Sequence, residues 1–280
     1  MSRLTGGVNK VPDWTPADMP DLAGRTAIVT GANSGIGWWT AAELARHGAH
    51  VTLAVRDAAK GADAAERIDA LAPGASVDVG NLDLADLSSV RSFASEWSAA
   101  HSRGAHAGGL DLLVNNAGVM AIPRRESADG YEMQFATNHL GHFALTGLLL
   151  PALVARPRSR VVTVSSTAHT FGRINGEDLM GELRYHPWSA YGQSKLANLL
   201  FTGELQRLLD ANHLSTKAMA AHPGYAATNL QMAGPRMSGR AWLERPMELG
   251  ARLLAQSAEQ GAWPTLFAAT APGLPGDSYA

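Results

Sequence analysis

The stretch TAIVTGANSGIG, residues 26–37, decides the fold class of this chain. Its first part, TAIVT (26–30), is a β-branched run typical of a buried strand, and a run with helical spacing follows from 36 to 48. Glycine at 31, 35 and 37 lets the backbone turn tightly and approach a ligand, and the next helix offers N–H groups to a diphosphate. The spacing G-x-x-x-G-x-G alone is a weak signal, so a glycine-rich turn without a ligand is the alternative.

Apolar runs and helical patterns alternate through the rest of the chain. Further strands are predicted at 50–56, 76–84, 110–118, 160–166 and 215–224, and further helices at 58–71, 87–101, 130–149 and 190–209. Repeated strand–helix units predict a parallel sheet with helices on both faces, and continuous apolar strands agree with burial on both sides. We therefore predict an α/β fold: a single-domain, Rossmann-type, doubly wound parallel sheet in three α/β/α layers.

No repeat, low-complexity segment or long linker divides the chain, so one domain is expected over residues 1–280. Residues 1–22 form an N-terminal extension to it. The segment 225–246 is irregular, rich in Gly, Pro and Met, and long for a connection. It predicts a lid over a substrate site, with a plain surface loop as the alternative.

Composition narrows the function classes. Hydrophobic residues make up 46% of the 280 residues, which is enough for one sizeable core. The formal net charge is −2, so neither nucleic acid nor an anionic membrane surface is an expected partner. The chain has no cysteine, which excludes disulfides, thiolate metal sites and cysteine nucleophiles. No apolar run reaches the roughly 20 residues of a membrane-spanning helix, and the N-terminal stretch does not resemble a secretory signal. We expect a cytoplasmic protein without a membrane partner.

The stretch YGQSKLAN, residues 191–198, places a phenol and an ammonium on one face of a predicted helix. Tyr191 and Lys195 are i,i+4 neighbours. A free phenol has a pKa of about 10 and is a poor acid or base at neutral pH, but a nearby cation lowers that pKa. Tyr191 is therefore a candidate general acid and base, activated by Lys195.

Several motifs occur in one order along the chain: TGANSGIG (30–37), NNAG (115–118), a serine ending the fifth strand, YGQSK (191–195) and HPG (222–224). This combination resembles the short-chain dehydrogenase/reductase family. The stretches AVRDAAKG, TNHLGHFALT and SKLANLLF make it most similar to the retinol-dehydrogenase-like and protochlorophyllide-reductase-like branch. The resemblance covers about residues 22 to 270. It implies an oxidoreductase that moves a hydride between a nicotinamide and the carbon of an alcohol, ketone or aldehyde.

The resemblance implies a catalytic set of Asn138, Ser166, Tyr191 and Lys195. Tyr191 exchanges the proton, Lys195 also binds the nicotinamide ribose, and Asn138 holds a water that links Lys195 to solvent. Successive strand side chains point to opposite faces, so only one of Ser165 and Ser166 can polarise the substrate oxygen. Alignment on the motif favours Ser166 and leaves Ser165 structural.

The resemblance also implies a dinucleotide site at the carboxyl ends of the strands, where open α/β sheets bind ligands. Its residues are Gly31, Asn33, Ser34, Gly35, Ile36, Gly37, Arg56, Asp83, Leu84, Asn115, Ala117, Gly118, Tyr191, Lys195, Pro223, Gly224 and Thr228. Arg56 stands where many such sites carry an acid for the ribose 2′-hydroxyl. Because a guanidinium pairs with a 2′-phosphate, NADP(H) is favoured as cofactor, and NAD(H) is the alternative if Asp57 binds the hydroxyl.

The expected substrate is a medium-to-large apolar ketone, aldehyde or alcohol. Segment 167–188 is expected to form one wall of its cleft, with further lining from Met120, Trp188 and the lid residues Tyr225, Leu230, Met232, Met237 and Trp242. The resemblance further implies a homodimer or homotetramer built through the helices near 130–149 and 190–209. It also implies a seventh strand at the C-terminus, which the ending GDSYA leaves short or absent.

Other readings of the chain stay open. A dinucleotide-binding sensor or scaffold with weak catalysis is one, although it would not need the four catalytic residues. An epimerase or dehydratase acting on sugar nucleotides is another, although few residues after 225 remain for its substrate domain. Four histidines show no metal-ligand spacing, so they are interpreted as core or cleft residues and no metal site is predicted: His139, His142, His169 and His222.

Overall fold

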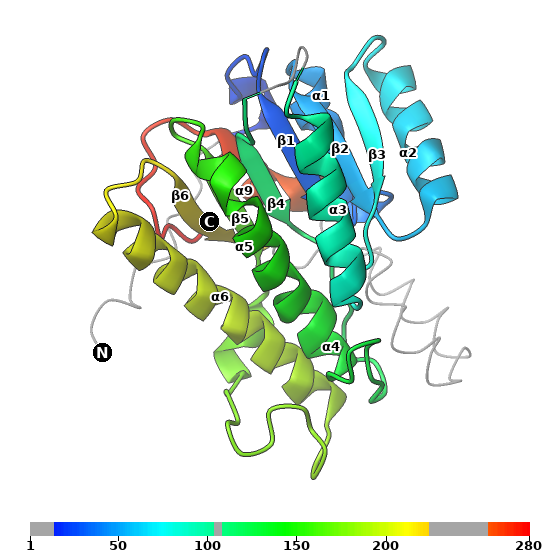
Figure 1. The fold of residues 1–280 in the computed structure, drawn as a ribbon, viewed down its shortest axis with the longest axis vertical. Helices are drawn as coiled ribbons and strands as arrows, with labels where there is room; N and C mark the ends of the chain where they lie inside the picture. Colours follow the sequence, from blue (N-terminus) through cyan, green and yellow to red (C-terminus); the bar gives the residue numbers. More distant parts are fainter. Residues whose placement is uncertain (1–13, 104–107, 224–256) are drawn as a thin grey trace.

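The computed structural model of the protein describes residues 14–103, 108–223 and 257–280. Within them, six parallel strands form one sheet in the order β3-β2-β1-β4-β5-β6 (Figure 1). The strands are β1 Thr26–Thr30, β2 His50–Val55, β3 Val77–Asn81, β4 Leu112–Asn115, β5 Arg160–Val164 and β6 Lys217–Ala221. The predicted parallel, doubly wound sheet is confirmed.

Helices cover both faces of this sheet. One apolar core lies between the strands and α1 (Gly35–Arg46), α2 (Ala58–Leu71) and α9 (Ala258–Thr270). A second core lies between the strands and α3 (Leu87–Ala100), α5 (Gly141–Val154) and α6 (Pro187–Ala211), which face the viewer in Figure 1. The strand order reverses between β1 and β4, so the crevice expected for a ligand opens at the carboxyl ends of these two strands.

The helix predicted at 130–149 begins and ends later than expected. It starts as α4 (Met133–Phe135), passes through a π-helical turn at Ala136–Leu140, and continues as α5 to Val154. Short 3₁₀ turns stand at Pro16–Asp18 (η1) and Thr167–Phe171 (η3). Helix α9 was not predicted at all, because its short sequence carries a proline and a glycine within its span.

The C-terminal residues extend the sheet beyond β6. Ala220 N donates to Ser278 O at 2.9 Å, Ala280 N donates to Ala220 O at 3.0 Å, and His222 N donates to Ala280 O at 2.9 Å. Tyr279 forms an isolated parallel bridge with Ala220. The seventh strand that the resemblance implies is therefore present here as a single bridge. Among the described residues, no helix is both long enough and apolar enough to span a membrane.

Candidate active site

The glycine loop after β1 packs against the turn that ends β4. Gly31 and Gly35 have φ values of +66° and +58°, in the left-handed region that favours glycine. Gly37 has no room for a side chain, since a Cβ there would lie 2.4 Å from Asn116 Nδ2 and 2.5 Å from Gly31 O. Asn116 Nδ2 donates to Thr30 O at 2.7 Å. The backbone path and the close approach of the two loops thus require all three glycines.

The N-terminus of α1 is open to an anion. Ser34 is its N-cap residue, but the serine side chain makes no capping hydrogen bond, and the first turn carries no acidic side chain. By contrast, Asp57, Asp86 and Ser257 cap α2, α3 and α9 with their side chains. The first N–H groups of a helix need an acceptor, and a phosphate at the positive end of the helix dipole supplies one. The diphosphate of a dinucleotide therefore fits this position.

Ser166, Tyr191 and Lys195 meet at the carboxyl end of β5. Tyr191 is 4% exposed and Lys195 is 3% exposed, both in the first part of α6. Lys195 Nζ lies 5.7 Å from the centroid of the Tyr191 ring and donates to Val164 O at 3.1 Å. Ser166 forms a side-chain hydrogen bond with Tyr191.

The two adjacent serines have different partners. Ser165 Oγ is buried and donates to Lys195 O at 2.9 Å. Ser166 Oγ accepts a hydrogen bond from Ala168 N at 3.3 Å and bonds to Tyr191. This arrangement agrees with Ser166 on the substrate side and Ser165 in the structure behind it. The catalytic role of Ser166 stays a prediction.

The acidity of Tyr191 differs from the expectation based on sequence. Burial raises the pKa of Tyr191 above its usual value, and the hydrogen bond with Ser166 opposes this rise without cancelling it. Burial also lowers the pKa of Lys195 to about 8. The expectation of a lowered pKa for Tyr191 is therefore wrong for the protein without a cofactor, because burial is the largest influence on this group.

Asn138 links the β4 turn to α6. The residue is fully buried in the π-helical turn before α5. Its Oδ1 accepts from Val119 N at 2.8 Å, and its Nδ2 donates to Val119 O and to Ser194 Oγ, both at 2.9 Å. Both amide hydrogens are thus used within the protein, so a water could bind only to its oxygen atoms. These contacts make Asn138 a positioning residue, and the water that the resemblance implies stays a prediction.

A buried hydrogen-bond chain runs from Asn138 to the glycine loop. His142 Nδ1 donates to Asn138 O at 3.1 Å, because a carbonyl oxygen can only accept. His142 Nε2 then accepts from Thr30 Oγ1 at 2.9 Å, and Thr30 Oγ1 accepts from the N–H groups of Asn116 and Ala117, each at 2.9 Å. Burial lowers the pKa of His142 to about 3, so its ring is neutral. The sequence analysis gave Thr30 and Asn116 no role in this chain of hydrogen bonds. The i,i+4 spacing of Asn138 and His142 was the one feature of the sequence that could have indicated it.

The end of β2 carries the charge expected to select the cofactor. Arg56 directly follows β2 and is exposed. Asp57 is engaged as the cap of α2: its Oδ1 accepts from Lys60 N at 3.2 Å, and its Oδ2 lies 3.1 Å from Lys60 Nζ. Hydrogen bonds from Lys60 lower the pKa of Asp57. The arrangement therefore favours Arg56 over Asp57 as the residue that meets the adenosine ribose.

A second guanidinium, which sequence reasoning missed, reaches the glycine loop. Arg67 Nη2 donates to Asn33 O at 2.7 Å, and Arg67 Cζ lies 4.8 Å from the centroid of the Trp38 ring. Trp38 Nε1 donates to Ala64 O at 3.1 Å, and its ring packs edge-on against Trp39. These contacts hold α2 against the loop that carries the predicted residues Asn33 and Ser34.

The remaining predicted cofactor residues that the structure describes lie at the same edge of the sheet, although one of them turns its side chain away. A Cβ on Gly118 would lie 3.1 Å from Asn138 Oδ1 and 3.6 Å from Lys195 Nζ, so Gly118 adjoins the catalytic group. Asn115 instead turns its buried side chain inward, where Nδ2 donates to Thr146 Oγ1 at 3.0 Å. The prediction that Asn115 lines the cofactor can therefore hold only for its backbone.

The other predicted positions are placed as follows. Asp83 Oδ1 accepts from Ala85 N at 2.9 Å, and Leu84 is buried. Ile36 lies in the first turn of α1, and Pro223 follows β6. Gly224, Thr228 and the lid at 225–246 lie outside the described residues.

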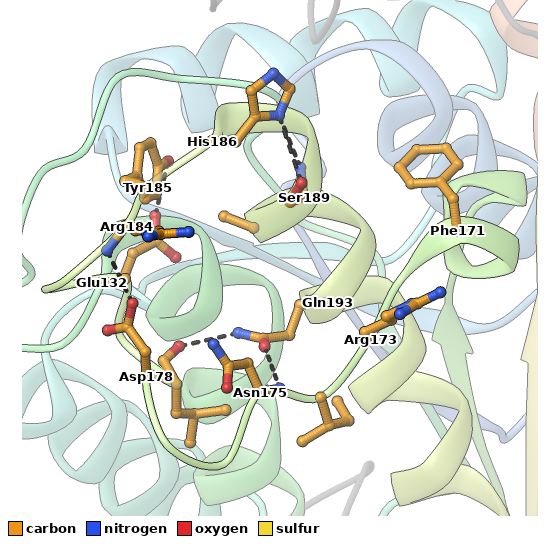
Figure 2. A pocket seen from close by; sticks show the side chains of 14 residues that line it. Glu132, Phe171, Arg173, Asn175, Asp178, Arg184, Tyr185, His186, Ser189 and Gln193 are labelled. Carbon is orange, nitrogen blue, oxygen red and sulfur yellow. Dashed lines mark hydrogen bonds between the residues drawn. The ribbon is translucent and has the colours of Figure 1, made fainter.

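The described residues hold a pocket of ≈ 520 Å³ beside the start of α6 (Figure 2). Gln193 spans it from α6: Oε1 accepts from Asn175 N and Nε2 donates to Leu179 O, each at 2.9 Å. Tyr191 and Lys195 do not line this pocket, although segment 171–186 forms most of its wall. The expectation that segment 167–188 forms one wall of the substrate cleft stays a prediction, because the predicted lid on the other side lies outside the described residues. The last residue of segment 167–188, Trp188, does reach the site, with its ring centroid 6.1 Å from that of Tyr191.

Comparison with known proteins shows to which family the chain belongs. Residues 25–238 match the family model described as short chain dehydrogenase, which is more than half of the chain. The chain belongs to the short-chain dehydrogenase family. It is 46% identical to retinol dehydrogenase 12 of Mus musculus over 209 residues, which are 75% of this chain and 64% of that protein. It is 44% identical to polyprenol dehydrogenase of Mus musculus over 270 residues, covering 94% of this chain and 77% of that protein. The predicted retinol-dehydrogenase-like branch is confirmed.

Solved structures of this family match the described fold. A protein of uncharacterised function from Mycobacterium paratuberculosis is 50% identical, with a TM-score of 0.75 over 95% of this chain and 83% of that chain. A protein described as an NAD(P)-dependent gluconate 5-dehydrogenase from Beutenbergia cavernae, solved with bound NADP, is 29% identical, with a TM-score of 0.68 over 92% of this chain and 95% of that chain. This short-chain dehydrogenase spans 64% of the length of retinol dehydrogenase 12.

Proposed function

We propose that this short-chain dehydrogenase is an NADP(H)-dependent oxidoreductase that interconverts an alcohol and a ketone or aldehyde on a medium-to-large apolar molecule. The observation that carries the proposal is the meeting of Ser166, Tyr191 and Lys195 at the carboxyl end of β5. The open N-terminus of α1 lies at the same edge of the sheet. When bound, the nicotinamide gives or accepts the hydride.

Side chains of the protein transfer the proton to or from the substrate oxygen. Ser166 donates a hydrogen bond to the substrate oxygen and holds it beside the Tyr191 hydroxyl. Tyr191 gives its proton to that oxygen in reduction and takes a proton from the alcohol in oxidation. Lys195, with its pKa lowered to about 8, can itself release and regain a proton near neutral pH. Burial of both side chains keeps bulk water from the proton transfer.

We propose a preference for NADP(H) on the basis of charge at the end of β2. Arg56 is exposed there, while the neighbouring carboxylate of Asp57 is held by α2. A guanidinium binds a 2′-phosphate through paired, charge-assisted hydrogen bonds. The NADP in the Beutenbergia cavernae structure supports the choice by likeness.

The proposed substrate class rests on the relatives and on the cleft. Retinol and polyprenol, named in the two curated relatives, are long apolar alcohols. Trp188 is 48% exposed beside Tyr191, where it offers an apolar surface to such a chain. A cytoplasmic location stays a prediction.

Titration with NADPH and NADH, followed by nicotinamide fluorescence, tests the cofactor choice. We expect tighter binding of NADPH, and reversal of the preference in Arg56→Asp, because the new carboxylate repels the 2′-phosphate and can accept from a 2′-hydroxyl. Arg91→Asp, an equal change of charge on the exposed side of α3, serves as the control and should keep the NADPH preference. Equal affinities of the unmutated protein for both cofactors would defeat the assignment.

We also propose that the protein self-associates through α5 and α6. Large apolar side chains stand exposed on these helices: Phe143 at 56%, Leu148 at 43%, Leu200 at 41% and Leu208 at 45%. The ring centroids of Phe143 and Phe201 lie 5.5 Å apart, so the two helices, which lie at the front of Figure 1, share one apolar face. Exposed apolar patches of this kind mark interaction surfaces.

A further inference from the structure

Three side chains that play no part in the proposed reaction face one another at the opposite end of the sheet. His50 begins β2, Asp78 is the second residue of β3, and His101 is the C-cap of α3. One ligand atom of each, an imidazole nitrogen or a carboxylate oxygen, lies within 4.8 Å of the other two. We propose that these three residues bind a divalent transition-metal ion, and that Zn²⁺ is its best match.

Both imidazoles are oriented through their other nitrogen. His101 Nδ1 lies 2.9 Å from Trp97 O, and since a carbonyl only accepts, Nδ1 carries the hydrogen and Nε2 keeps the lone pair in the neutral ring. His50 Nδ1 lies 2.7 Å from Ser76 Oγ. Metal-binding histidines are typically held in this way, with the outer nitrogen bonded to a polar group of the protein.

The ring of His101 is also fixed by stacking. It lies nearly parallel to the Trp97 ring, with centroids 4.1 Å apart and planes 13° apart. Trp97 is itself anchored, because its Nε1 donates to Thr52 Oγ1 at 3.1 Å. The His50 and His101 rings are 5.4 Å apart between centroids. The two nitrogen ligands are therefore placed before an ion arrives.

The distances suit a small ion after a modest closure. Four ligands about 2.05 Å from Zn²⁺ in a tetrahedron lie about 3.3 Å from one another. His50 Nε2 and Asp78 Oδ2 are already 3.1 Å apart. Two imidazoles and one carboxylate form a ligand set that Zn²⁺ accepts, with a water in the fourth position. The Asp78 side chain is 63% exposed, so the site opens to solvent and the ion can enter.

The ion would act on the fold and not on the chemistry. β2 runs from His50 to Val55, just before Arg56, so the cluster lies about 20 Å from the cofactor edge of the sheet. There it would join the edge strand β3 to β2 and α3 (Figure 1). The sequence did not reveal the site because positions 50, 78 and 101 follow no ligand spacing and meet only through the fold.

Calorimetric titration of the untagged, chelator-treated protein with ZnCl₂ tests the inference without any measurement of turnover. We expect one saturable site, binding weakened at least about tenfold in His101→Ala and in Asp78→Asn, and unchanged binding in the control His213→Asn. These positions are used because His50 is buried and its replacement could disturb folding. Co²⁺ in place of Zn²⁺ should give visible d–d bands in the unmutated protein that both variants lose.

Thermal unfolding gives a second readout. Zn²⁺ at a hundredfold excess over its dissociation constant should raise the unfolding temperature by about 5 °C in the unmutated protein and in His213→Asn, and much less in His101→Ala. Absence of saturable binding, or equal binding by His101→Ala and the unmutated protein, would overturn the proposal and mean that His50 and Asp78 form only an ion pair. Either result leaves the proposed oxidoreductase activity untouched.

Discussion

Lys195 is a residue whose burial lowers the stability of the folded protein and serves the proposed proton transfer. The residue is 3% exposed, and its ammonium donates a hydrogen bond to Val164 O. Burial lowers its pKa to about 8 from the model-peptide value of 10.5. Between these two values the unfolded chain holds the proton more tightly than the folded protein, so stability from this group rises with pH and is lost as pH falls through 8.

We expect Lys195→Met to raise the free energy of unfolding at pH 7 by about 1–3 kcal/mol, because the buried charge is removed, while turnover is abolished. The gain in the free energy of unfolding from Lys195→Met should be about 1 kcal/mol smaller at pH 9 than at pH 7, because much of Lys195 in the folded unmutated protein is already neutral at pH 9. The raised pKa of Tyr191 has the opposite effect on stability. Above about pH 10 the folded protein keeps the phenol proton that the unfolded chain loses, so stability from this group falls as pH rises. Urea unfolding of Lys195→Met and of the unmutated protein at pH 7 and pH 9 measures the gain from the methionine and its decline. A variant less stable than the unmutated protein at pH 7 would contradict the account.

At this scale the sequence predicted which residues meet, but not their acidity. The sequence separated Ser165 from Ser166 by strand alternation, and the two side chains do have different partners, although β5 ends before them at Val164. The pKa of Tyr191 was predicted with the wrong sign, because burial depends on side chains brought in from other elements. The bond between Thr30 and His142 joins positions 112 residues apart, which no local pattern could reveal.

At the scale of elements, the glycine loop depends on Gly37 more than its helical position indicates. A Cβ on this residue would lie 2.5 Å from Gly31 O, which is backbone and cannot move aside easily. Gly147 in α5 is the matched control, since a Cβ there would meet nothing within 4 Å.

We therefore expect Gly37→Ala to destabilise the protein by more than about 1 kcal/mol and to weaken NADPH binding, because the loop must move away from Asn116. Gly147→Ala should instead stabilise it by about 0.5–1 kcal/mol through the helix preference of alanine, with NADPH binding unchanged. Denaturant unfolding and fluorescence titration of both variants check this. Equal effects of the two substitutions would argue against the close approach of the two loops.

Strongly patterned elements were predicted well from sequence, and irregular ones were not. The bounds predicted for α2, residues 58–71, agree with the structure because an Asp cap and an alanine-rich run mark them. The π-helical turn at Ala136–Leu140 leaves no periodic signal, since it depends on the bonds that Asn138 and His142 make to other segments. Helix α9 was hidden by the proline within it.

At the scale of the whole molecule, the parallel sheet can be predicted from the alternation of strands and helices in the sequence. The surface proposed for self-association of the protein cannot be predicted in this way. Apolar strands buried on both faces leave few other arrangements. The apolar face shared by α5 and α6 becomes visible only when Phe143 and Phe201, 58 positions apart, come together.

We expect the protein to sediment as a dimer or tetramer at micromolar concentration, and Phe143→Lys combined with Leu200→Lys to sediment as a monomer, because two ammonium groups would have to be buried in the interface. Leu183→Lys, at a position 82% exposed in the segment before α6, is the control and should not change the assembly. Analytical ultracentrifugation makes the measurement. A monomeric unmutated protein would remove the proposed interface.

The central claim is that Tyr191 transfers the proton beside a bound nicotinamide. The most direct test compares the rate of NADPH oxidation by Tyr191→Phe and by the unmutated protein, with an apolar ketone or aldehyde and at matched NADPH occupancy. The account predicts that the variant binds NADPH normally and reduces the substrate at least about a hundredfold more slowly. Turnover by Tyr191→Phe at the rate of the unmutated protein would contradict it.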